Sequence, residues 1–556
     1  MKPNTLSPWL PSERMNGWPV LALSCAVLSA SLAGAGENFD LRGFIDLKLK
    51  SGEKRIVVPP GTYRVKPKKR CHLLLRDLQD VEIVAAGVEM ICTETTRALT
   101  ISNCRNLTLR GLTVDYDPLP FTQGRIVRLS GDGRVHEIEL FDGYPRSDQV
   151  EERKYAIFKS DTRTLRFGSY YDFKVEKLAP DRIRLTKSKY SRKHPEQVGD
   201  TVVIGASDAP GGSIPHAISI DRSTDLVLED ITLYASNCFG YIEHDCSNTT
   251  YRRCRVDRRS SETDIRKRAD PRVRSLNADA FHSKHAVVGP KYIECSARFQ
   301  GDDCIAINGD YHMVMGAEGA KLRVMGKHGI NIKPGDPLEV VNYEGVRLPD
   351  AKAVSVKEIG RITDEERAFL SKQRMNERYK NGKANRVFEV VVDRPLDLPR
   401  GSVMAAANRI GNGFKIVNGR FGFNRSRGLI VKASRGEIVG NKLEGCEMHA
   451  IYLAPEYWWL EAGSSDGVAI RGNVITRCGS RPIAVVARGG RGKVAPAGAH
   501  NDITIVDNRI EKCPSPAIWV TSTKGLLLNG NTIEPLEGEN EKEAFDLVNC
   551  EDVKRN

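Results

Sequence analysis

Three aspartates are the residues of this sequence whose types and spacing best suit catalysis. Asp279 stands in Leu276-Asn-Ala-Asp-Ala-Phe-His282, and Asp302 and Asp303 adjoin in Gly301-Asp-Asp-Cys-Ile-Ala-Ile-Asn308. Crowded carboxylates push their pKa values apart, so one can stay protonated as an acid while another acts as a base. Such a pair of groups can cleave a glycosidic bond. The structural alternative is that each Asp caps backbone N–H groups at a turn, as a lone Asp commonly does.

These acids can cooperate only if the fold stacks them, and a loose internal repeat predicts that it does. Each copy has a polar turn, a short alternating strand, a Gly, Asn or Asp turn and another strand; clear copies are Ser102–Val114, Asp221–Leu233, Ser465–Cys478, Asn501–Cys513 and Thr523–Ile533. Strands this short cannot bury a face alone, but parallel strands of successive coils share one core. Asn at the turns tolerates left-handed backbone and can bond between coils. The sequence therefore predicts an all-β fold, a parallel β-helix, with a β-sandwich as the alternative.

The interval from Asp279 to Asp302 is roughly one coil of such a helix. Because stacked coils lie about 4.8 Å apart, we expect Asp279 to lie beside the Asp302–Asp303 pair. With a sideways offset, two acids can reach a separation of about 6.5–9.5 Å, the usual spacing in inverting glycosidases, which leaves room for a water molecule.

Two stretches, 118–212 and 313–410, interrupt the repeat with alternating strands that lack the turn Asn. We predict that both are inserted antiparallel, barrel-like β modules. The coils then comprise 36–117, 213–312 (with the acidic site) and 411–556, and 363–385 is the only good candidate for a short helix.

The N-terminal residues predict export. An apolar run from Trp18 to Leu32 follows Lys2 and Arg14, and Ala33-Gly34-Ala35 has the form of a signal-peptidase site. We therefore predict a cleavable signal peptide over 1–35 and a secreted or periplasmic protein. The run is too short to span a bilayer, so we expect no stable membrane insertion.

The composition excludes several classes of protein. Of the 556 residues, 40% are hydrophobic and 28% are charged, which excludes a disordered chain, a collagen and a multi-span membrane protein. The net charge is +13, but the basic residues are scattered, with small clusters at Lys66–Arg70 and Arg266–Arg274. This pattern favours a solvated basic surface over nucleic-acid binding.

The 13 cysteines are expected to be mostly free, buried thiols. Export permits disulfides, but apart from Cys25, in the predicted signal peptide, most of them end strand-like runs where a small apolar side chain fits a buried turn. No C-x-x-C pair or His/Cys cluster has zinc spacing, and we predict no metal and no cofactor.

The acidic motifs carry a family resemblance. Asn277-Ala-Asp279 and Asp302-Asp303-Cys-Ile-Ala-Ile307 resemble elements of the polygalacturonase-type enzymes of glycoside hydrolase family 28. Ile56–Val65 resembles the opening segment of the pectin-lyase-like superfamily, whose members are right-handed β-helices. The Gly-His-Gly of family 28 is absent, although Asp310-Tyr-His312 stands nearby, and its uronate-binding Arg-Ile-Lys is missing. By this analogy Asp302 is the acid, while Asp279 and Asp303 activate water.

A closer resemblance covers nearly all of the chain after residue 35. The layout of Val114–Gly124, an insert, the acids, a second insert, Asn424–Val431 and Ala450–Glu461 is similar to glycoside hydrolase family 110, the exo-α-1,3-galactosidases. Those enzymes are β-helices with two inserted β-barrel modules. The resemblance implies release of terminal α-1,3-linked galactose from glycans, by inversion and without a metal. It also implies that the catalytic residues are Asp279, Asp302 and Asp303.

Further residues are predicted to bind the sugar. Trp458 could stack on its apolar face; as neighbours in a strand, Trp458 and Trp459 would point to opposite sides, so at most one faces the groove. The others offer hydrogen bonds to hydroxyl groups: Glu243, His312, Arg427, Glu456 and Glu461.

The expected partner is an oligosaccharide or polysaccharide with terminal galactose. Two alternatives stay open: a polygalacturonase-like or other β-helix polysaccharide hydrolase, and a non-catalytic glycan-binding β-helix. The sequence does not indicate an oligomeric state.

Overall fold

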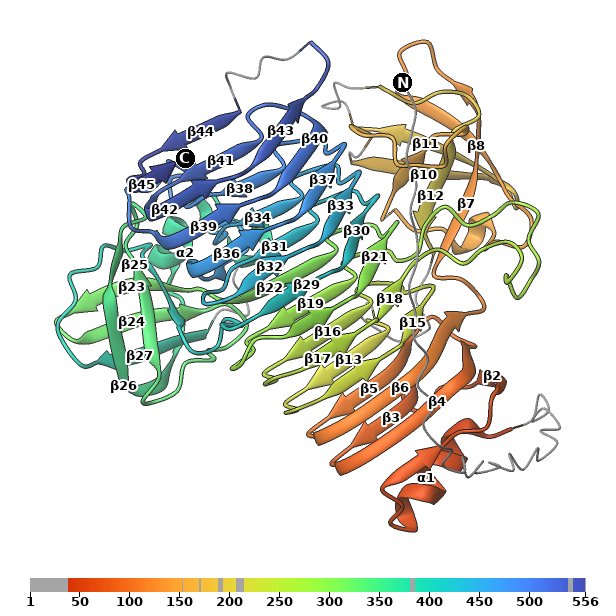
Figure 1. Cartoon of the computed structure of the whole chain (residues 1–556), viewed down its shortest axis with the longest axis horizontal. Helices are drawn as coiled ribbons and strands as arrows, with labels where there is room; N and C mark the ends of the chain where they lie inside the picture. The colour runs from red at the N-terminus through yellow and green to blue at the C-terminus, as the bar shows by residue number, and fades with distance from the viewer. Residues whose placement is uncertain are drawn as a thin grey trace, which may run out of the picture.

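The computed structural model describes residues 39–152, 154–169, 172–188, 194–206, 215–380, 386–538 and 544–555. The predicted signal peptide, 1–35, lies outside the described residues. Through the rest, the chain winds into stacked coils whose strands run parallel, with two lateral inserts (Figure 1). Among the helices in these ranges, none has the length and apolar character needed to cross a membrane.

One sheet carries the acids, and we call it sheet B. Its strands pair in parallel from β3 to β44, one per coil, and β35 adds an antiparallel pair to β22. Its members are β3 (Cys71–Arg76), β5 (Arg97–Ser102), β13 (Ile218–Asp221), β16 (Tyr241–His244), β19 (Phe281–Lys284), β22 (Ile305–Asp310), β31 (Leu429–Val431), β34 (Ile451–Leu453), β35 (Glu461–Ala462), β38 (Ile483–Val485), β41 (Ile518–Thr521) and β44 (Phe545–Val548).

The remaining coil strands form a larger parallel sheet, sheet A, in which the long strands β4 and β6 bend around the coil and join two faces. Its members are β1 (Arg55–Val57), β2 (Gly61–Val65), β4 (Gln79–Cys92), β6 (Arg105–Tyr116), β14 (Val227–Glu229), β15 (Thr232–Leu233), β17 (Thr250–Arg252), β18 (Arg255–Val256), β20 (Lys291–Ile293), β21 (Ser296–Arg298), β29 (Lys415–Val417), β30 (Arg420–Gly422), β32 (Glu437–Val439), β33 (Lys442–Glu444), β36 (Asp466–Arg471), β37 (Val474–Thr476), β39 (His500–Val506), β40 (Arg509–Cys513), β42 (Thr523–Asn529), β43 (Thr532–Pro535) and β45 (Glu551–Arg555).

The core runs along the inside of the coils, as the period-two pattern predicts. Tyr241 and Phe281 occupy the same inward position on adjacent strands, and their rings stack with centroids 4.7 Å apart. Both are buried, like the inward residues of the other coils. The parallel pairing of the repeats excludes the β-sandwich.

A ladder of asparagine side chains links the turns of successive coils. Asn441 donates to Asn473 at 3.0 Å, Asn473 to Asn508 at 2.9 Å, and Asn508 to Asn531 at 2.9 Å. Each amide forms hydrogen bonds with polar groups of the turn that would otherwise be buried without a partner.

The cysteines between residues 71 and 550 are all free, and most are buried, as predicted.

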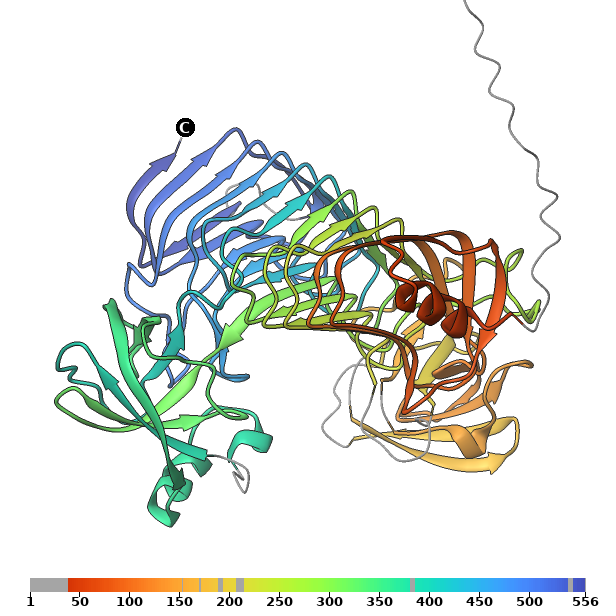
Figure 2. The same ribbon diagram turned by 90° about the horizontal axis from the view of Figure 1, so that it is seen from below.

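Each insert is an antiparallel module. The first is a six-stranded sheet of β7 (Phe121–Leu129), β8 (Val135–Leu140), β9 (Ala156–Phe158), β10 (Phe173–Ala179), β11 (Arg182–Lys187) and β12 (Thr201–Gly205). The second is a closed barrel of β23 (His312–Glu318), β24 (Lys321–Gly326), β25 (Pro337–Val341), β26 (Arg347–Arg361), β27 (Arg386–Val392) and β28 (Val403–Ala406). Figure 2 shows both inserts leaving the same side of the β-helix. The predicted fold class is confirmed.

The helices are few. The predicted helical stretch contains α2 (Asp364–Ser371) and α3 (Glu377–Lys380), and α2 begins with a reciprocal cap in which Thr363 and Glu366 each accept the other's backbone N–H. The expectation that this stretch held the only helix was wrong. A further helix, α1 (Leu41–Lys50), packs Leu41 and Ile45 onto the first coils, and η1 (Ser147–Gln149) is a single turn.

Candidate active site

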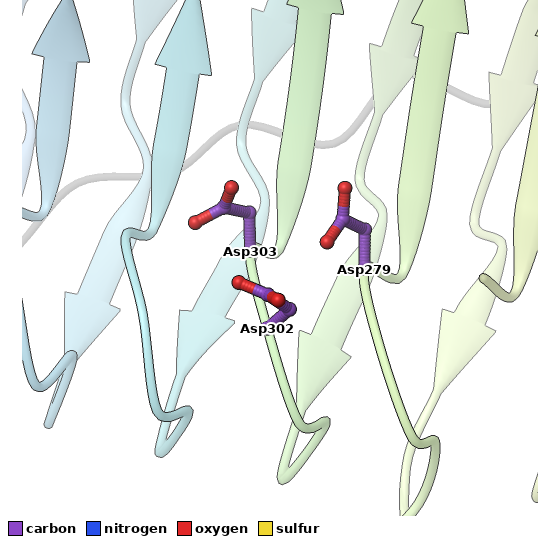
Figure 3. A group of neighbouring side chains, drawn as sticks. All are labelled: Asp279, Asp302 and Asp303. Atoms are coloured by element: carbon purple, nitrogen blue, oxygen red, sulfur yellow. The ribbon is translucent and has the colours of Figure 1, made fainter. Parts of the chain in front are cut away.

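Asp279 and Asp303 occupy the same position on adjacent coils. Each lies two residues before a strand of sheet B, and the first residues of those strands, Phe281 and Ile305, are paired. The N–H of Ala280 donates to the carbonyl of Asp303 at 2.9 Å, so the pairing extends toward the acids. Figure 3 shows the carboxylates of Asp279 and Asp303 side by side, with Asp302 below them. One oxygen from each of the three acids lies within 4.8 Å of the others.

The motif residues around the acids hold the two coils together. Asn277 donates its side-chain amide to the carbonyl of Pro120 at 2.8 Å, which ties the coil to the start of the first insert. Gly301 lies so close to the previous coil that a Cβ would stand 2.7 Å from the Asn277 carbonyl oxygen. Asn424, from the next coil, donates to the carbonyl of Asp302 at 2.8 Å. The backbone at each acid is thus fixed from a neighbouring coil.

A buried ionic cluster holds the loop that leads into Asp279. Asp115 on β6 is fully buried and accepts two hydrogen bonds of 2.9 Å from Arg272. Arg272 also donates to Asp264 at 3.1 Å, and Arg259 donates to Asp115 at 2.9 Å. Separating such a pair would leave a buried charge without compensation, so these ion pairs hold the loop in one position.

The electrostatics divide the acids into different roles. Burial, together with the neighbouring Asp302 and Asp303 carboxylates, raises the pKa of Asp279 well above its ordinary value. Burial also works against ionisation of Asp303, but the Arg427 guanidinium outweighs it and holds the pKa of Asp303 below its ordinary value. Asp279 is therefore the group best suited to hold a proton, and Asp303 the group best suited to stay ionised.

Asp302 is the most accessible of the three acids. Its side chain is 29% exposed, against 7% for Asp279 and 5% for Asp303. Arg425 binds it through Nη2 at 2.8 Å and donates from Nε to the carbonyl of Gly301 at 2.6 Å. Asp302 is thus oriented by a guanidinium while still reaching solvent.

His282 supports Asp279 from the same strand. Its Nδ1 lies 2.7 Å from Asp279 Oδ2, and its Nε2 lies 3.1 Å from Asn308 Nδ2. Because the Asn308 amide is assigned as a donor, Nε2 accepts and Nδ1 donates to Asp279. Burial lowers the pKa of His282 to about 3, so the ring is neutral. This is the role of a local hydrogen-bonding partner.

A chain of buried ion pairs of alternating sign runs from the acids across sheet B. Arg427 binds Asp303 at 2.7 Å and Glu456 at 3.2 Å, and Lys432 binds Glu456 at 2.8 Å and Glu461 at 2.7 Å. Three predicted substrate-binding residues, Arg427, Glu456 and Glu461, therefore lie in one network with a catalytic candidate.

The barrel insert joins this network through Lys327, which follows β24. Its Nζ lies 3.2 Å from Asp310 on β22 and 3.9 Å from Glu461. Lys284 on β19 binds the same Asp310 oxygen at 3.2 Å. These contacts anchor the barrel to the coils that carry the acids.

Trp458 lies beside the network on a cavity of about 220 Å³ that Tyr452, Glu456 and Arg488 also line. Its side chain is 44% exposed, whereas Trp459 packs against the barrel core. Trp458 is the more exposed of the two, but both stand in a turn, so the prediction that they are neighbours in a strand was wrong.

Two predicted substrate-binding residues do not reach this surface. Glu243 points into the coil, where Ser283 donates to it at 2.6 Å and Tyr251 at 3.1 Å, and burial raises its pKa. His312 on β23 is also buried and bonds Asn331 at 2.8 Å. Both carry out their hydrogen bonding within the protein, so we correct the prediction that they contact substrate.

The sequence reasoning missed the cations Arg425, Lys432 and Lys327. Arg425 could have been found, because it stands two residues before Arg427 in the same turn. Lys432 directly follows an apolar strand, but its two carboxylate partners come from a later turn.

The acids also form a group of three carboxylates that could hold a cation. Carboxylate oxygens suit Ca²⁺ or Mg²⁺, which take six or more oxygen ligands in most protein sites. The acid–base chemistry described above requires no ion.

Comparison with known proteins supports the predicted resemblance. A family model described as a right handed beta helix region matches residues 401–534. Alpha-1,3-galactosidase A of Bacteroides thetaiotaomicron is 23% identical over 525 residues, covering 88% of this chain and 84% of the relative. Alpha-1,3-galactosidase B of the same organism is 25% identical over 514 residues, covering 85% and 76%. The predicted resemblance to the α-1,3-galactosidases is thereby confirmed.

Among solved structures, the mannuronan C-5 epimerase AlgE4 A-module of Azotobacter vinelandii aligns over 93% of this chain and 92% of its own. The identity is 11% and the TM-score 0.37, so this likeness carries no argument about chemistry.

Proposed function

We propose that this chain is an exo-glycosidase that releases terminal α-1,3-linked galactose from glycans by aspartate acid–base catalysis. The observation that carries the proposal is the trio Asp279, Asp302 and Asp303, in which burial and neighbouring carboxylates raise the pKa of Asp279 while Arg427 lowers the pKa of Asp303. The similarity to α-1,3-galactosidases along most of the chain supports a glycoside hydrolase and suggests the sugar.

In this proposal Asp279 donates a proton to the glycosidic oxygen while Asp303 removes a proton from the attacking water. The bond between the anomeric carbon and the leaving oxygen breaks as the water oxygen bonds to that carbon. His282 holds Asp279 Oδ2, which leaves Oδ1 to carry the proton. This assignment differs from the polygalacturonase analogy, in which Asp302 is the acid.

The two assignments predict different behaviour toward an activated substrate. A general acid is dispensable when the leaving group departs without protonation, whereas a general base is not. We therefore expect Asp279→Asn to lose most activity on a galactosyl disaccharide but to retain it on a dinitrophenyl α-galactoside. Asp303→Asn should lose both. If Asp302→Asn is the variant rescued by the activated substrate, the analogy is right and our assignment is wrong.

We propose inversion of the anomeric centre, on the basis of the family resemblance. The acids are closer together than expected: one oxygen from each lies within 4.8 Å, below the separation of about 6.5–9.5 Å usual in inverting enzymes. This proximity is nearer to the carboxyl spacing of about 5–5.5 Å in retaining enzymes. Proton NMR of the first sugar released decides: a β-anomer from an α-galactoside supports inversion, and an α-anomer supports retention.

A panel of oligosaccharides tests the substrate. We expect release of galactose from α-1,3-linked chain ends and not from internal positions. Binding of such glycans without hydrolysis would support a glycan-binding β-helix instead. Hydrolysis of another linkage alone would support a different β-helix polysaccharide hydrolase.

Export completes the proposal, and the apolar run Trp18–Leu32 with Ala33-Gly34-Ala35 supports it. Mass spectrometry of the intact protein from the extracellular or periplasmic fraction should give a chain that begins near Gly36. Recovery of uncleaved protein from the cytoplasm alone would contradict export.

A further inference from the structure

A second cavity, of about 530 Å³, lies at the N-terminal end of sheet B, and its lining is strongly basic. Among the residues that the structure describes, none that lines it is acidic. Thr96, Thr100, Cys71, Leu74 and Pro215 complete the walls, and six cationic side chains contribute: Arg42, Lys68, Lys69, Arg70, Arg76 and Arg97. So many cations around one concave surface create a positive potential that attracts an anion.

Four of the six cations, Lys68, Lys69, Arg76 and Arg97, are available to a ligand. Among the described residues, no carboxylate forms an ion pair with Lys68, Lys69, Arg76 or Arg97, whereas Arg253 on a later coil pairs with both Glu229 and Asp230. Lys68, Lys69 and Arg76 are exposed at the cavity rim, and Arg97 is half-buried in its wall. The pocket is therefore not neutralised from within.

Three of these cations, Lys68, Lys69 and Arg70, stand in one tight turn. Lys68 and Cys71 exchange both backbone hydrogen bonds, at 2.9 and 3.1 Å, around Lys69 and Arg70. Both central residues have positive φ, 48° and 62°. Turns of this kind favour Asn and Gly at these positions. The turn places Lys69 and Arg70 next to each other on the wall of the cavity.

The register of sheet B connects this pocket to the acids. Leu99, Ile218, Tyr241 and Phe281 pair in sequence across β5, β13, β16 and β19. Two residues before each of them stand Arg97, His216, Phe239 and Asp279, in one row. Three coil spacings of about 4.8 Å separate Arg97 from Asp279, or about 14 Å, which a short oligosaccharide can span.

Aromatic rings occupy the interval. His216 stacks on Phe239 with centroids 4.8 Å apart, and Phe239 stacks on His282 at 4.7 Å. His216 and Phe239 are partly exposed. On the other side of the acids, the Glu456–Trp458 cavity lies on later coils. The acids therefore stand between a basic pocket and a cavity with an aromatic and a carboxylate wall.

We propose that the basic pocket is a subsite for an anionic group of the substrate, either a sulfate ester or a uronate carboxylate, a few sugar units from the bond that is cleaved. The terminal sugar then occupies the side of Glu456 and Trp458, and the remaining glycan passes over His216 and Phe239. This inference rests on the proposed function for the identity of the ligand as a glycan. It assigns the substrate to the class of charged polysaccharides.

Binding measurements test the subsite independently of hydrolysis. Isothermal titration calorimetry compares three probes of equal length: a sulfated galactan oligosaccharide, its chemically desulfated counterpart and an oligogalacturonate. We expect at least one of the two anionic probes to bind tenfold or more tightly than the neutral probe at low salt, and its advantage to shrink with added NaCl. The tighter anion identifies the source of the charge.

The double variant Arg76→Gln, Arg97→Gln should reduce the ratio of anionic to neutral affinity to about one. Arg420→Gln, which removes an exposed arginine from β30 on sheet A, is the matched control and should keep the ratio of the wild type. Thermal unfolding confirms that each variant is folded; if the double variant is not, Arg76→Glu alone, at the exposed rim, should reverse the preference.

Equal binding of the anionic and neutral probes by the wild type would overturn the subsite. So would an equal loss in the Arg420→Gln control, or single-stranded DNA binding as tightly as the sulfated probe, because both outcomes would indicate a general charge effect. A protein that binds the anionic probe but releases no galactose would retain the subsite and lose the proposed function.

Discussion

Arg427 holds Asp303 with two parallel contacts, Nη2 to Oδ2 at 2.7 Å and Nε to Oδ1 at 3.0 Å, and its backbone N–H donates to Oδ1 at 2.8 Å. Three donors from one residue on the next coil thus meet a single carboxylate. Bidentate guanidinium contacts of this kind fix both the charge and the plane of a carboxylate. Asp303 is therefore held ionised and oriented before a substrate arrives.

The first prediction concerns this contact. Arg427→Met removes the cation that lowers the pKa of Asp303, so that pKa rises and the acidic limb of the pH–activity profile moves to higher pH. We expect kcat/KM at neutral pH to fall about 100-fold, the smaller end of what a general base contributes. Arg427→Lys keeps the positive charge but loses the bidentate contact, so it should move the acidic limb less. An unmoved acidic limb in Arg427→Met would contradict the role of Asp303 as base.

A second prediction links Asp279 to stability. The folded pKa of Asp279 is raised above its ordinary 3.8. Its contribution to folding stability is therefore complete below about pH 3.8 and is lost as the pH rises through the folded pKa. Asp279→Asn cannot ionise, so we expect it to lose most activity on the disaccharide yet increase the free energy of unfolding at pH 7 by about 1–3 kcal/mol.

Chemical denaturation at several pH values checks this prediction. The gain should shrink as the pH falls from the folded pKa toward about 3.8 and vanish below it, where the wild-type carboxyl is protonated in both states. The comparison Asp302→Asn, which breaks the ion pair of this acid with Arg425, should give no gain. A loss of stability in Asp279→Asn at pH 7 would contradict the raised pKa.

A third prediction concerns the buried cluster below the catalytic loop. Arg272→Leu leaves the fully buried Asp115 with Arg259 as its remaining cation, and breaking such a pair costs about 3–5 kcal/mol. The exposed pair of Lys415 and Glu437 is the control: Lys415→Ala should cost about 1 kcal/mol or less. Urea denaturation of both variants measures the difference. Equal costs would mean that Asp115 relaxes to solvent.

The fourth prediction tests the close approach of the two acidic coils. Gly301→Ala places a Cβ 2.7 Å from the Asn277 carbonyl oxygen, so the coils must separate. We expect lower thermal stability and at least a tenfold loss of kcat/KM, because the acids move relative to one another. Gly131→Ala, where a Cβ meets nothing within 4 Å, is the control and should behave like the wild type. Full activity in Gly301→Ala would show that the spacing of the acids is not critical.

The fifth prediction concerns metal removal. Because the proposed reaction uses only carboxyl groups and water, exhaustive dialysis against EDTA should leave kcat unchanged. The assay is repeated with added Ca²⁺ and Mg²⁺. A loss of activity that either ion restores would assign the three carboxylates to cation binding.

The sequence predicted that the acids stack, because their stacking depends only on the number of residues in one coil. Asp279 and Asp303 follow the same position of two successive repeats, so counting residues places them together. The direction of Glu243 was not accessible in the same way. On β16 the apolar Ile242 faces outward and the carboxyl faces inward, against the usual pattern, and only the partners Ser283 and Tyr251 explain it.

The cations of the site illustrate a second limit of sequence reasoning. Lys432 and Lys327 both bind Glu461 at the start of β35, and the turn before β35 packs against the barrel. Which charges meet there depends on how an insert packs on the coils, and no local pattern encodes that packing. Helix α1 was missed because it is a short element in which Leu41 and Ile45 are the buried apolar residues and Phe44 and Leu49 are only partly buried.

Because Arg97 and Asp279 stand in one row across successive coils, the distance between them is a whole number of coil spacings. The number of windings between them fixes how far a charge on the substrate can stand from the scissile bond, and each added or deleted winding would change that reach by about 4.8 Å. Duplication of a whole repeat between them would thus change which unit of a polymer the basic pocket binds, without altering the acids.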